Sequence, residues 1–460
     1  MTDHSSFFAR PAPWAPSDLN EATRLSLTSI AASTRAQAVV ERLVDLVAAQ
    51  ERSGGRKNQR RAAGLEKLSN ALGAVLGGVL RPWSRPTPRW VYHLVGRSAF
   101  TGERIGARQF QAAISGLKAA NLIEVVPGFS TTDDFDGGDP ILRFGRATRF
   151  RPTAALLDLV EAHGITPQGI VEDFLDVFPE EPPSVPDPVI LRPLKPPRRK
   201  GMQKPPVAPL RLDPDDDYVR HFVGEVNSFN KFASNFDVRG CRPPRWYRTF
   251  TEDFQHGGRW IAAGNEGNYQ RLPQSQRLMI TIDGSEVVSL DVSASHLSIM
   301  LGLAGLPLPS GDPYALGGLP RAVMKHLVVV TAGKGALPSR WPSDTPPDIT
   351  ETPIEDAAAA LVAAYPFMDE PWRLVPFDGD PKRGRRLFVH RLMEIEARAI
   401  TFAMVLLRHE GILALPVHDE LIVRADATEA GRAMLARGYR TAAKIEPLIK
   451  ETRRADEGSL

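Results

Sequence analysis

Asp291 and Asp419 are the residues of this 460-residue chain whose setting most clearly suggests chemistry. Asp291 lies near the end of the apolar, β-branched run Val287–Val292, and an apolar helix is predicted to follow it. Asp419 lies in a His-Asp-Glu turn between two short apolar segments, ILALPV and LIVRA, which predict a β-hairpin. Each aspartate by itself would be interpreted as a helix cap or a turn residue.

The two carboxylates together suggest a metal site. Burial of a carboxylate among apolar residues is costly unless the group is paired or binds a metal. Two carboxylates at the edges of short strands can hold two Mg²⁺ ions about 4 Å apart, and Mn²⁺ could replace them. One ion would activate a primer 3′-hydroxyl and the other would stabilise the leaving pyrophosphate. We therefore expect Asp291 and Asp419 to be catalytic metal ligands, with the main-chain carbonyl of Val292 as a further ligand.

These segments resemble conserved motifs of the family A nucleotide polymerases, which include DNA polymerase I and the single-subunit RNA polymerases. LDVSASHLSIMLGLAG resembles motif A, and VHDEL resembles motif C. Three further segments resemble family pieces in the family's order: GGRWIAAGNEGNYQRLP, GDPYAL and RAVMKHLVVVTAGKG, the last of which resembles motif B. The resemblance covers residues 240–430 approximately. It implies a compact, divergent α+β polymerase palm, in which an antiparallel sheet packs with helices, and small fingers.

The resemblance implies that the chain is a template-directed nucleotidyltransferase, most simply a DNA polymerase acting in replication, in repair or on a mobile element. Its partners would be a primed template and nucleoside triphosphates. Arg321 and Lys325 are four residues apart on a predicted helix, so they would present two cations to one triphosphate. His296 stands where family DNA polymerases carry a bulky residue that excludes the 2′-hydroxyl. Contacts with DNA are implied for Arg259, Gln270 and His418.

One departure from the family's motif B leaves alternative functions open. The family's aromatic residue, eight positions after the motif B lysine, is replaced by Gly333, which alters how base-pair geometry is checked. The alternatives are a single-subunit RNA polymerase or primase, and a catalytically silent, polymerase-like DNA-binding replication protein.

On the predicted helix over residues 387–411, Glu394 and Glu396 lie away from the apolar stripe. We interpret them as solvated, with an approach to the active site as the alternative.

The chain before this region predicts separate domains. Residues 1–20, rich in Pro and Ser, predict a disordered tail, and residues 21–87 predict a helical region. Residues 88–177 show the order helix, helix, strand, loop, strand, with a first helix over 89–97, which resembles a winged helix-turn-helix. Its helix 107–121 would bind a DNA major groove through Arg108 and Lys118, and a structural or partner-binding role is the alternative. The wing would be flanked by Arg143, Arg146, Arg149 and Arg151.

A proline-dense stretch, residues 178–216, predicts a semi-extended linker before the polymerase domain at 217–460. Its basic cluster is either solvated or in contact with phosphates: Lys195, Arg198, Arg199, Lys200 and Lys204.

Composition places the chain among ordinary globular proteins, with 42% hydrophobic and 24% charged residues. A net charge of +3 does not by itself indicate nucleic-acid binding. The single cysteine, Cys241, excludes an intramolecular disulfide and a cysteine-rich zinc site, and it fits a reducing compartment. We see neither a signal peptide nor an apolar run long enough for a membrane span, so we expect a cytoplasmic protein without a membrane partner.

Overall fold

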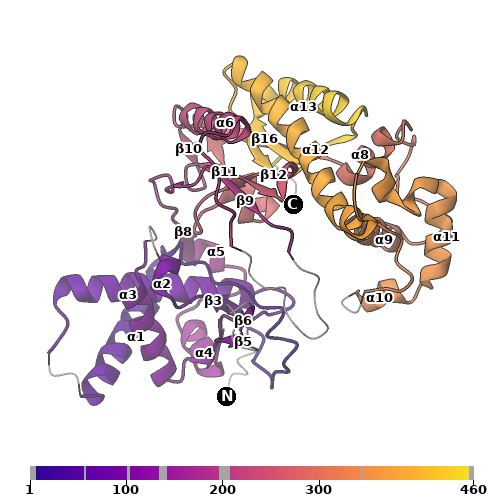
Figure 1. Cartoon of the computed structure of the whole chain (residues 1–460). Coiled ribbons are helices and arrows are strands. Elements are labelled where there is room, and N and C mark those ends of the chain that lie inside the picture. Colours follow the sequence, from indigo (N-terminus) through magenta and orange to yellow (C-terminus); the bar gives the residue numbers. More distant parts are fainter. Residues whose placement is uncertain are drawn as a thin grey trace. The chain divides into compact units, whose positions relative to one another are not determined.

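The computed structural model describes residues 7–55, 58–100, 104–133, 142–195, 208–342 and 345–454. These residues form two compact units, each with its own hydrophobic core (Figure 1). The first unit contains the described residues up to Glu181 together with Asn265–Gly267, and the second contains the others from Pro182. Both combine helices with mainly antiparallel sheets, which confirms the predicted α+β class.

The first unit is built on two long helices, α1 (Thr34–Ser53) and α2 (Ala62–Trp83), and α3 (Ala107–Ala119) packs against both. The side chain of Ser33 caps α1 by accepting a hydrogen bond from the Ala36 amide. A four-stranded sheet has the order β1-β3-β7-β4. The remaining elements are β1 (Thr23–Arg24), β2 (Ser29–Ala31), β3 (Val91–His93), η1 (Arg97–Phe100), β4 (Ile123–Val126), β5 (Phe129–Asp133), β6 (Leu142–Arg146), β7 (Thr148–Pro152), α4 (Ala154–Ala162), α5 (Ile170–Asp173) and β8 (Phe174–Asp176).

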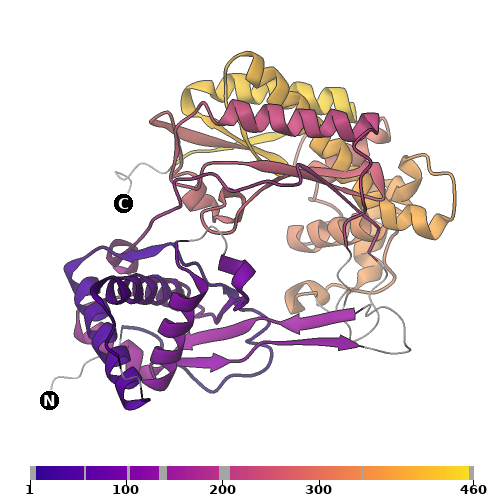
Figure 2. The same cartoon turned by 60° about the vertical axis from the view of Figure 1, so that its left-hand side comes forward.

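The helix predicted over residues 89–97 is wrong, because the middle of this segment, Val91–His93, forms strand β3. Val91 and His93 are buried while Tyr92 between them is half-buried, which is the two-residue period of a strand. β3 pairs antiparallel with β7, and β7 pairs antiparallel with β4. The chain therefore runs β3, η1, α3, β4 and, after the β5–β6 hairpin, β7. Figure 2 shows that hairpin as a two-stranded ribbon extending away from the helices of its own unit.

Residues 7–20 differ from the disordered tail predicted for residues 1–20, because they pack onto the first unit. Phe8 and Leu19 are buried in the core. The guanidinium of Arg151 donates to the carbonyl oxygen of Ala12 at 2.8 Å, and that of Arg149 donates to the carbonyl oxygen of Leu19 at 3.0 Å. These two arginines hold the N-terminal segment, whereas the sequence predicted that they flank a wing. The side chain of Arg143 lies outside the described part of the chain.

The second unit contains a sheet with the order β10-β13-β14-β16-β15, in which β17 also pairs with β14. α12 and α13 pack together, and α13 contacts β14 and β16 (Figure 1). Its elements are α6 (Asp217–Ala233), β10 (Val238–Arg239), β11 (Trp246–Thr251), β12 (Asp253–Ala262), η2 (Tyr269–Arg271), α7 (Gln274–Arg277), β13 (Thr281–Ile282), β14 (Ser285–Val292), α8 (Ser295–Leu303), α9 (Arg321–Lys334), α10 (Pro347–Thr350), α11 (Ile354–Ala364), η3 (Pro366–Met368), η4 (Pro371–Leu374), α12 (Pro381–His409), β15 (Leu415–Val417), β16 (Glu420–Arg424), η5 (Ala425–Ala427), α13 (Thr428–Ala443) and β17 (Ile449–Thr452).

The predicted linker over 178–216 contains a strand of the second unit. β9 (Val189–Arg192) pairs in parallel with β11 at the edge of the small sheet β12-β11-β9. Pro188 and Pro193 flank this strand, and prolines are tolerated at the ends and edges of sheets. The cations Arg198, Arg199, Lys200 and Lys204 of the predicted basic cluster fall outside the described residues. No described helix is both long and apolar enough to span a lipid bilayer.

Candidate active site

The structure brings Asp291 and Asp419 together at one end of the large sheet of the second unit. Asp291 lies on β14 directly opposite Glu420, the first residue of β16. The amide of Val292 donates a hydrogen bond to the carbonyl oxygen of Asp419 at 3.2 Å. The segment that contains Asp419 is the predicted hairpin, in which β15 and β16 enclose a two-residue turn. Both aspartates are half-buried.

The hairpin turn is held in a specific conformation. His418, the first residue of the turn, has a φ of 57°, a value that is uncommon for residues other than glycine. Two residues earlier, the carbonyl oxygen of Pro416 accepts hydrogen bonds from the Tyr269 hydroxyl at 2.8 Å and from Gln270 Nε2 at 2.7 Å. The turn before Asp419 is therefore anchored to the segment after β12.

Gln270 is placed behind the hairpin, where its amide is used by the protein backbone. Besides Pro416, its Nε2 donates to the carbonyl oxygen of Trp260 at 3.0 Å, and its Oε1 accepts from the amide of Ala262 at 2.8 Å. Both amide hydrogens are thereby satisfied within the protein. These contacts give Gln270 a positioning role, in place of the DNA contact predicted from the sequence.

Burial and mutual repulsion disfavour the ionised form of the two aspartates when no counterion is bound. Burial, with the negative charges of Glu396 and Asp291, raises the pKa of Asp419 to about 7. Burial also raises the pKa of Asp291, while the positive charges of Lys450, Arg277 and, more weakly, Lys325 act in the opposite direction. Such a pair would be stabilised by a bound cation.

Glu396 on α12 is a central residue of the site, for which the sequence indicated an approach to the active site only as the alternative. Its interpretation as solvated is wrong, because it is 1% exposed. Its Oε1 accepts a hydrogen bond from Arg259 Nε at 2.9 Å and lies 2.7 Å from Nη2 in the same ion pair, and its Oε2 accepts from the Ser295 hydroxyl at 3.0 Å. A signal was present in the sequence: the residues four positions before and after Glu396, Leu392 and Ile400, are both apolar and belong to the core.

His296, the residue predicted to exclude the 2′-hydroxyl, lies beside this ion pair. Its Nε2 is 3.4 Å from Arg259 Nη2 and 3.4 Å from Glu396 Oε2. Burial lowers the pKa of His296, and the positive charge of Arg259 acts in the same direction, while Glu396 opposes it. The surrounding chain partly desolvates the exposed His418, and this desolvation, with the charge of Arg259, lowers its pKa too.

Glu420 and Lys450 are two further charged residues to which the sequence assigned no role. Glu420 accepts hydrogen bonds from the Ser289 hydroxyl at 2.7 Å and from Arg277 at 2.8 Å, and burial raises its pKa. Lys450 on β17 is the cross-strand partner of Asp291. Its position 159 residues later in the chain offers no local signal, so only the strand pairing reveals it.

The two predicted triphosphate ligands lie on one exposed face of α9. Lys325 is close enough to Asp291 for its charge to lower the pKa of that carboxyl group. Arg321 forms an ion pair with Asp312, and its guanidinium lies over the ring of Tyr314, 5.2 Å from the centroid. Val329 follows on the same face with 59% exposure.

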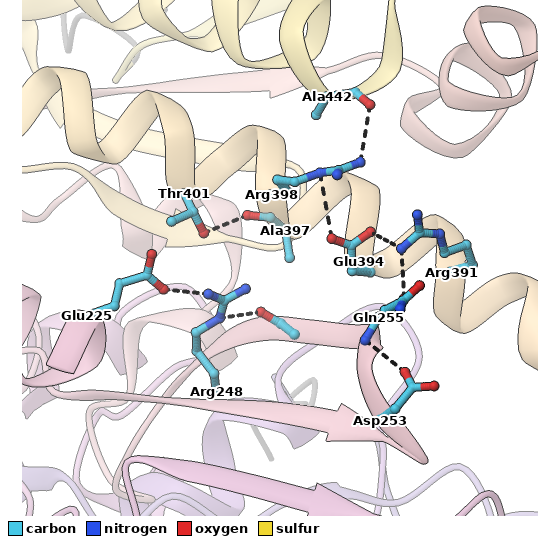
Figure 3. Close-up of polar contacts among 11 residues, drawn as sticks. Glu225, Arg248, Asp253, Gln255, Arg391, Glu394, Ala397, Arg398, Thr401 and Ala442 are labelled. Carbon is cyan, nitrogen blue, oxygen red and sulfur yellow. Dashed lines mark hydrogen bonds and ion pairs between the residues drawn. The ribbon is translucent and has the colours of Figure 1, made fainter. Parts of the chain in front are cut away.

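Helix α12, which carries Glu396, is fixed by a second polar network (Figure 3). Glu394 binds Arg391 at 2.8 Å and Arg398 at 3.6 Å, so its interpretation as solvated is wrong as well. Arg391 donates to the carbonyl oxygen of Gln255 at the start of β12, and Arg398 donates to that of Ala442 near the end of α13. The helix is thereby tied to elements on both sides of it.

The donor set at the aspartates fits a site for Mg²⁺. Within the described ranges neither Asp291 nor Asp419 forms an ion pair, so both carboxylates are available as ligands. The same residues contain no group of three or more His, Cys, Asp or Glu side chains arranged to hold a metal. The protein would therefore supply two carboxylates and the predicted Val292 carbonyl. Mg²⁺ can bind at a site with so few protein ligands, because it keeps several waters and also binds substrate phosphates.

Arg108 and Lys118 lie elsewhere, on the exposed face of α3 in the first unit. They share this face with Gln111 and Ser115, while Phe110, Ile114 and Leu117 on the opposite face are buried in the core. Neither cation forms an ion pair with any residue that the structure describes. The face is therefore polar and positively charged.

Comparison with known proteins assigns no family to the chain. No protein-family model matches it, and no curated protein matches it. Among solved structures, it is similar to the polymerase domain of Pol1 from M. smegmatis in complex with a DNA primer-template and dNTP. The identity is 12%, the TM-score is 0.27, and the match covers 51% of this chain and 52% of that chain. The chain thus spans about half of the length of that domain, and a likeness of this degree identifies neither a family nor an activity.

Proposed function

We propose that the second unit is a template-directed nucleotidyltransferase, most simply a DNA polymerase, that uses Mg²⁺ ions bound by Asp291 and Asp419. The observation that carries this proposal is the meeting of the two half-buried carboxylates across β14 and the β15–β16 hairpin, where neither forms an ion pair with a residue that the structure describes. Arg259 and Lys325 lie close enough for their charges to act on these aspartates. Carboxylates that hold cations, with basic side chains around them, are the arrangement that phosphoryl transfer requires.

In the proposed reaction the primer 3′-oxygen attacks the α-phosphorus of the incoming nucleotide, and the bond to the β-phosphate oxygen breaks. When bound, Mg²⁺ supplies a lower pKa for the 3′-hydroxyl and compensation of the charge that develops on the phosphates. Lys325 and Arg321 bind the triphosphate from α9. Tyr269 and Gln270 keep the turn before Asp419 in place through the Pro416 carbonyl.

The sugar of the nucleotide is proposed to pack against His296. The imidazole is held beside Arg259 and Glu396, and its lowered pKa keeps it neutral near pH 7. The neutral imidazole packs against the Arg259–Glu396 ion pair, so it has little freedom to move away from a 2′-hydroxyl. This arrangement favours deoxynucleotides over ribonucleotides.

The first unit is proposed to bind DNA through α3. The order β3, η1, α3, β4, hairpin, β7 and the antiparallel arrangement β3-β7-β4 match the layout of winged helix-turn-helix domains. Arg108 and Lys118, which form no ion pair with the described residues, lie on the exposed face of α3 and are suited to phosphates or base edges of a major groove.

The test is primer extension by the full chain with Mg²⁺, offered dNTPs or rNTPs on primed and unprimed templates. We expect extension with dNTPs on the primed template only, and its loss in Asp291→Asn and Asp419→Asn. Asp426→Asn is the matched control. Asp426 is an exposed aspartate paired with Arg424, and it lies beyond the opposite end of β16 from Asp419. Extension restricted to rNTPs would assign an RNA polymerase, or a primase if no primer is needed. DNA binding without synthesis in any form would identify a catalytically silent protein.

A further inference from the structure

A cavity of about 960 Å³ lies beside the proposed active site within the second unit. Ser293 and Ala294, which directly follow Val292, line one side, and Arg321 and Tyr314 line another. The segments 305–313 and 444–448 complete the lining. The cavity is therefore adjacent both to the strand that carries Asp291 and to a cation proposed to bind the triphosphate.

Two residues that line this cavity have strained backbones. Lys444, which ends α13, has a φ of 58°, and Ala294, which precedes α8, has a φ of 54°. Glycine is the usual residue at such a helix end, because a side chain is disfavoured in the left-handed conformation. Non-glycine residues in this conformation cluster at functional sites. A lysine in this conformation, where glycine would be unstrained, therefore points to a use for its side chain.

The charges around the cavity leave Lys444 uncompensated. The acidic residues of the lining include Asp312, which is paired with Arg321, and Glu446, which is paired with Arg440 at 2.6 Å. Lys444 itself forms no ion pair in the part of the chain that the structure describes. The cavity thus offers one free ammonium group to an anion.

The position of Lys444 is set by close packing. A Cβ atom on Gly302 of α8 would lie 1.9 Å from the carbonyl oxygen of Ala443, so α8 and the end of α13 are in contact at that point. Arg398 on α12 donates to the carbonyl oxygen of Ala442 at 3.4 Å (Figure 3). Ala443 and Ala442, the two residues before Lys444, are therefore held by α8 and α12 respectively.

We propose that this cavity binds the β- and γ-phosphates of the incoming nucleotide and holds the pyrophosphate after bond formation, with Lys444 as a phosphate ligand. The inference rests on the proposed nucleotidyl transfer. In that step the 3′-hydroxyl loses its proton to solvent, its oxygen forms the new bond to the α-phosphorus, and the bond from that phosphorus to the bridging oxygen breaks. The electron pair of the broken bond remains on the pyrophosphate, whose negative charge Lys444 and Arg321 then stabilise.

The decisive variant is Lys444→Gly, which removes the ammonium group and also relieves the strained backbone. We expect the affinity for pyrophosphate, measured by calorimetry on the full chain with Mg²⁺, to fall roughly tenfold, as expected for a lost hydrogen bond to a charged group. The KM for the nucleotide in primer extension should rise by a similar factor. The melting temperature should not fall, and DNA affinity should be unchanged. Lys444→Arg should retain binding, and Lys334→Gln, an exposed lysine at the end of α9, is the control.

The outcomes separate this inference from the proposed function. If wild-type protein extends primers but Lys444→Gly binds pyrophosphate and nucleotide as wild type does, the role of Lys444 is overturned and the polymerase proposal stands. Absence of pyrophosphate binding in the wild-type protein overturns the assignment of the cavity. If no synthesis occurs and Asp419→Asn behaves as wild type in every assay, the proposed function itself fails.

Discussion

Glu396 and Arg259 form an ion pair in which one oxygen of the buried Glu396 carboxylate accepts a hydrogen bond from the guanidinium Nε at 2.9 Å and lies 2.7 Å from Nη2. Glu396 comes from α12 and Arg259 from β12, so the pair joins a helix to a strand 137 residues away in the chain. The same carboxylate raises the pKa of Asp419. One residue outside the recognised motifs therefore both supports the site and acts on its electrostatics.

The first prediction concerns the stability that this pair provides. Glu396→Ala leaves Arg259 without its partner in a largely buried position, and we expect the free energy of unfolding to fall by about 3 kcal/mol. Glu396→Gln should cost less, because its amide oxygen can still accept a hydrogen bond. Urea unfolding curves provide the measurement. Glu410→Ala, at the exposed end of the same helix, should change stability by less than about 0.5 kcal/mol. Equal losses for both alanine variants would contradict the prediction.

The second prediction concerns pH and Asp419. Without a bound cation, burial and the charges of Glu396 and Asp291 raise its pKa to about 7, whereas a carboxyl group of the unfolded chain has a pKa of about 4. The folded state therefore binds the proton more tightly. Below pH 4 this group costs nothing, and its destabilising effect grows as the pH rises through 7. The wild type should lose stability relative to Asp419→Asn between pH 4 and 7, as measured by thermal melts in EDTA.

Addition of Mg²⁺ should reverse this trend, because the cation binds the ionised carboxylates. The gain in melting temperature on adding Mg²⁺ should be larger at pH 8 than at pH 5, and Asp419→Asn should show little gain. In EDTA, a difference in melting temperature between wild type and Asp419→Asn that stays constant from pH 4 to pH 7 would refute the raised pKa of Asp419.

The third prediction concerns the anchor of the hairpin. Tyr269→Phe removes a hydroxyl that donates to the Pro416 carbonyl and accepts from Trp246 Nε1 at 2.8 Å. Trp246 is completely buried, so its N–H is left without a partner, and we expect a loss of about 1–3 kcal/mol in the free energy of unfolding. Primer extension should slow as well, because the turn before Asp419 is less constrained. Tyr247→Phe, on the neighbouring half-buried residue of β11, is the control for both measurements.

The fourth prediction concerns the first unit. Arg108→Gln with Lys118→Gln should weaken duplex DNA binding by the full chain, measured by fluorescence anisotropy. If both cations contact phosphates, the slope of log K against log salt should decrease by about two. Arg42→Gln, which removes an exposed cation from α1, should leave both quantities unchanged. Binding with the wild-type affinity and salt slope in the double variant would exclude α3 as the DNA contact.

The sequence predicted the local elements of the proposed site well where short-range patterns decide them. The strand with Asp291, the helix after it and the hairpin with Asp419 are all present, because strand periodicity and a two-residue turn are encoded within a few residues. It failed at residues 89–97, where the alternating burial of β3 depends on pairing with β7, more than 50 residues later. The strand β9 within the proline-rich segment was missed for the same reason, since β11 provides its partner.

By itself the sequence determined the local elements that carry Asp291 and Asp419, the residues proposed to bind Mg²⁺. Only the tertiary structure decided which charges surround those residues. Glu396 and Lys450 become neighbours of the aspartates through helix packing and strand pairing, and Gln270 turns to the Pro416 carbonyl because β12 and the hairpin pack together. Electrostatic interactions depend on distance in space and on burial, and neither quantity is contained in the spacing of residues along the chain.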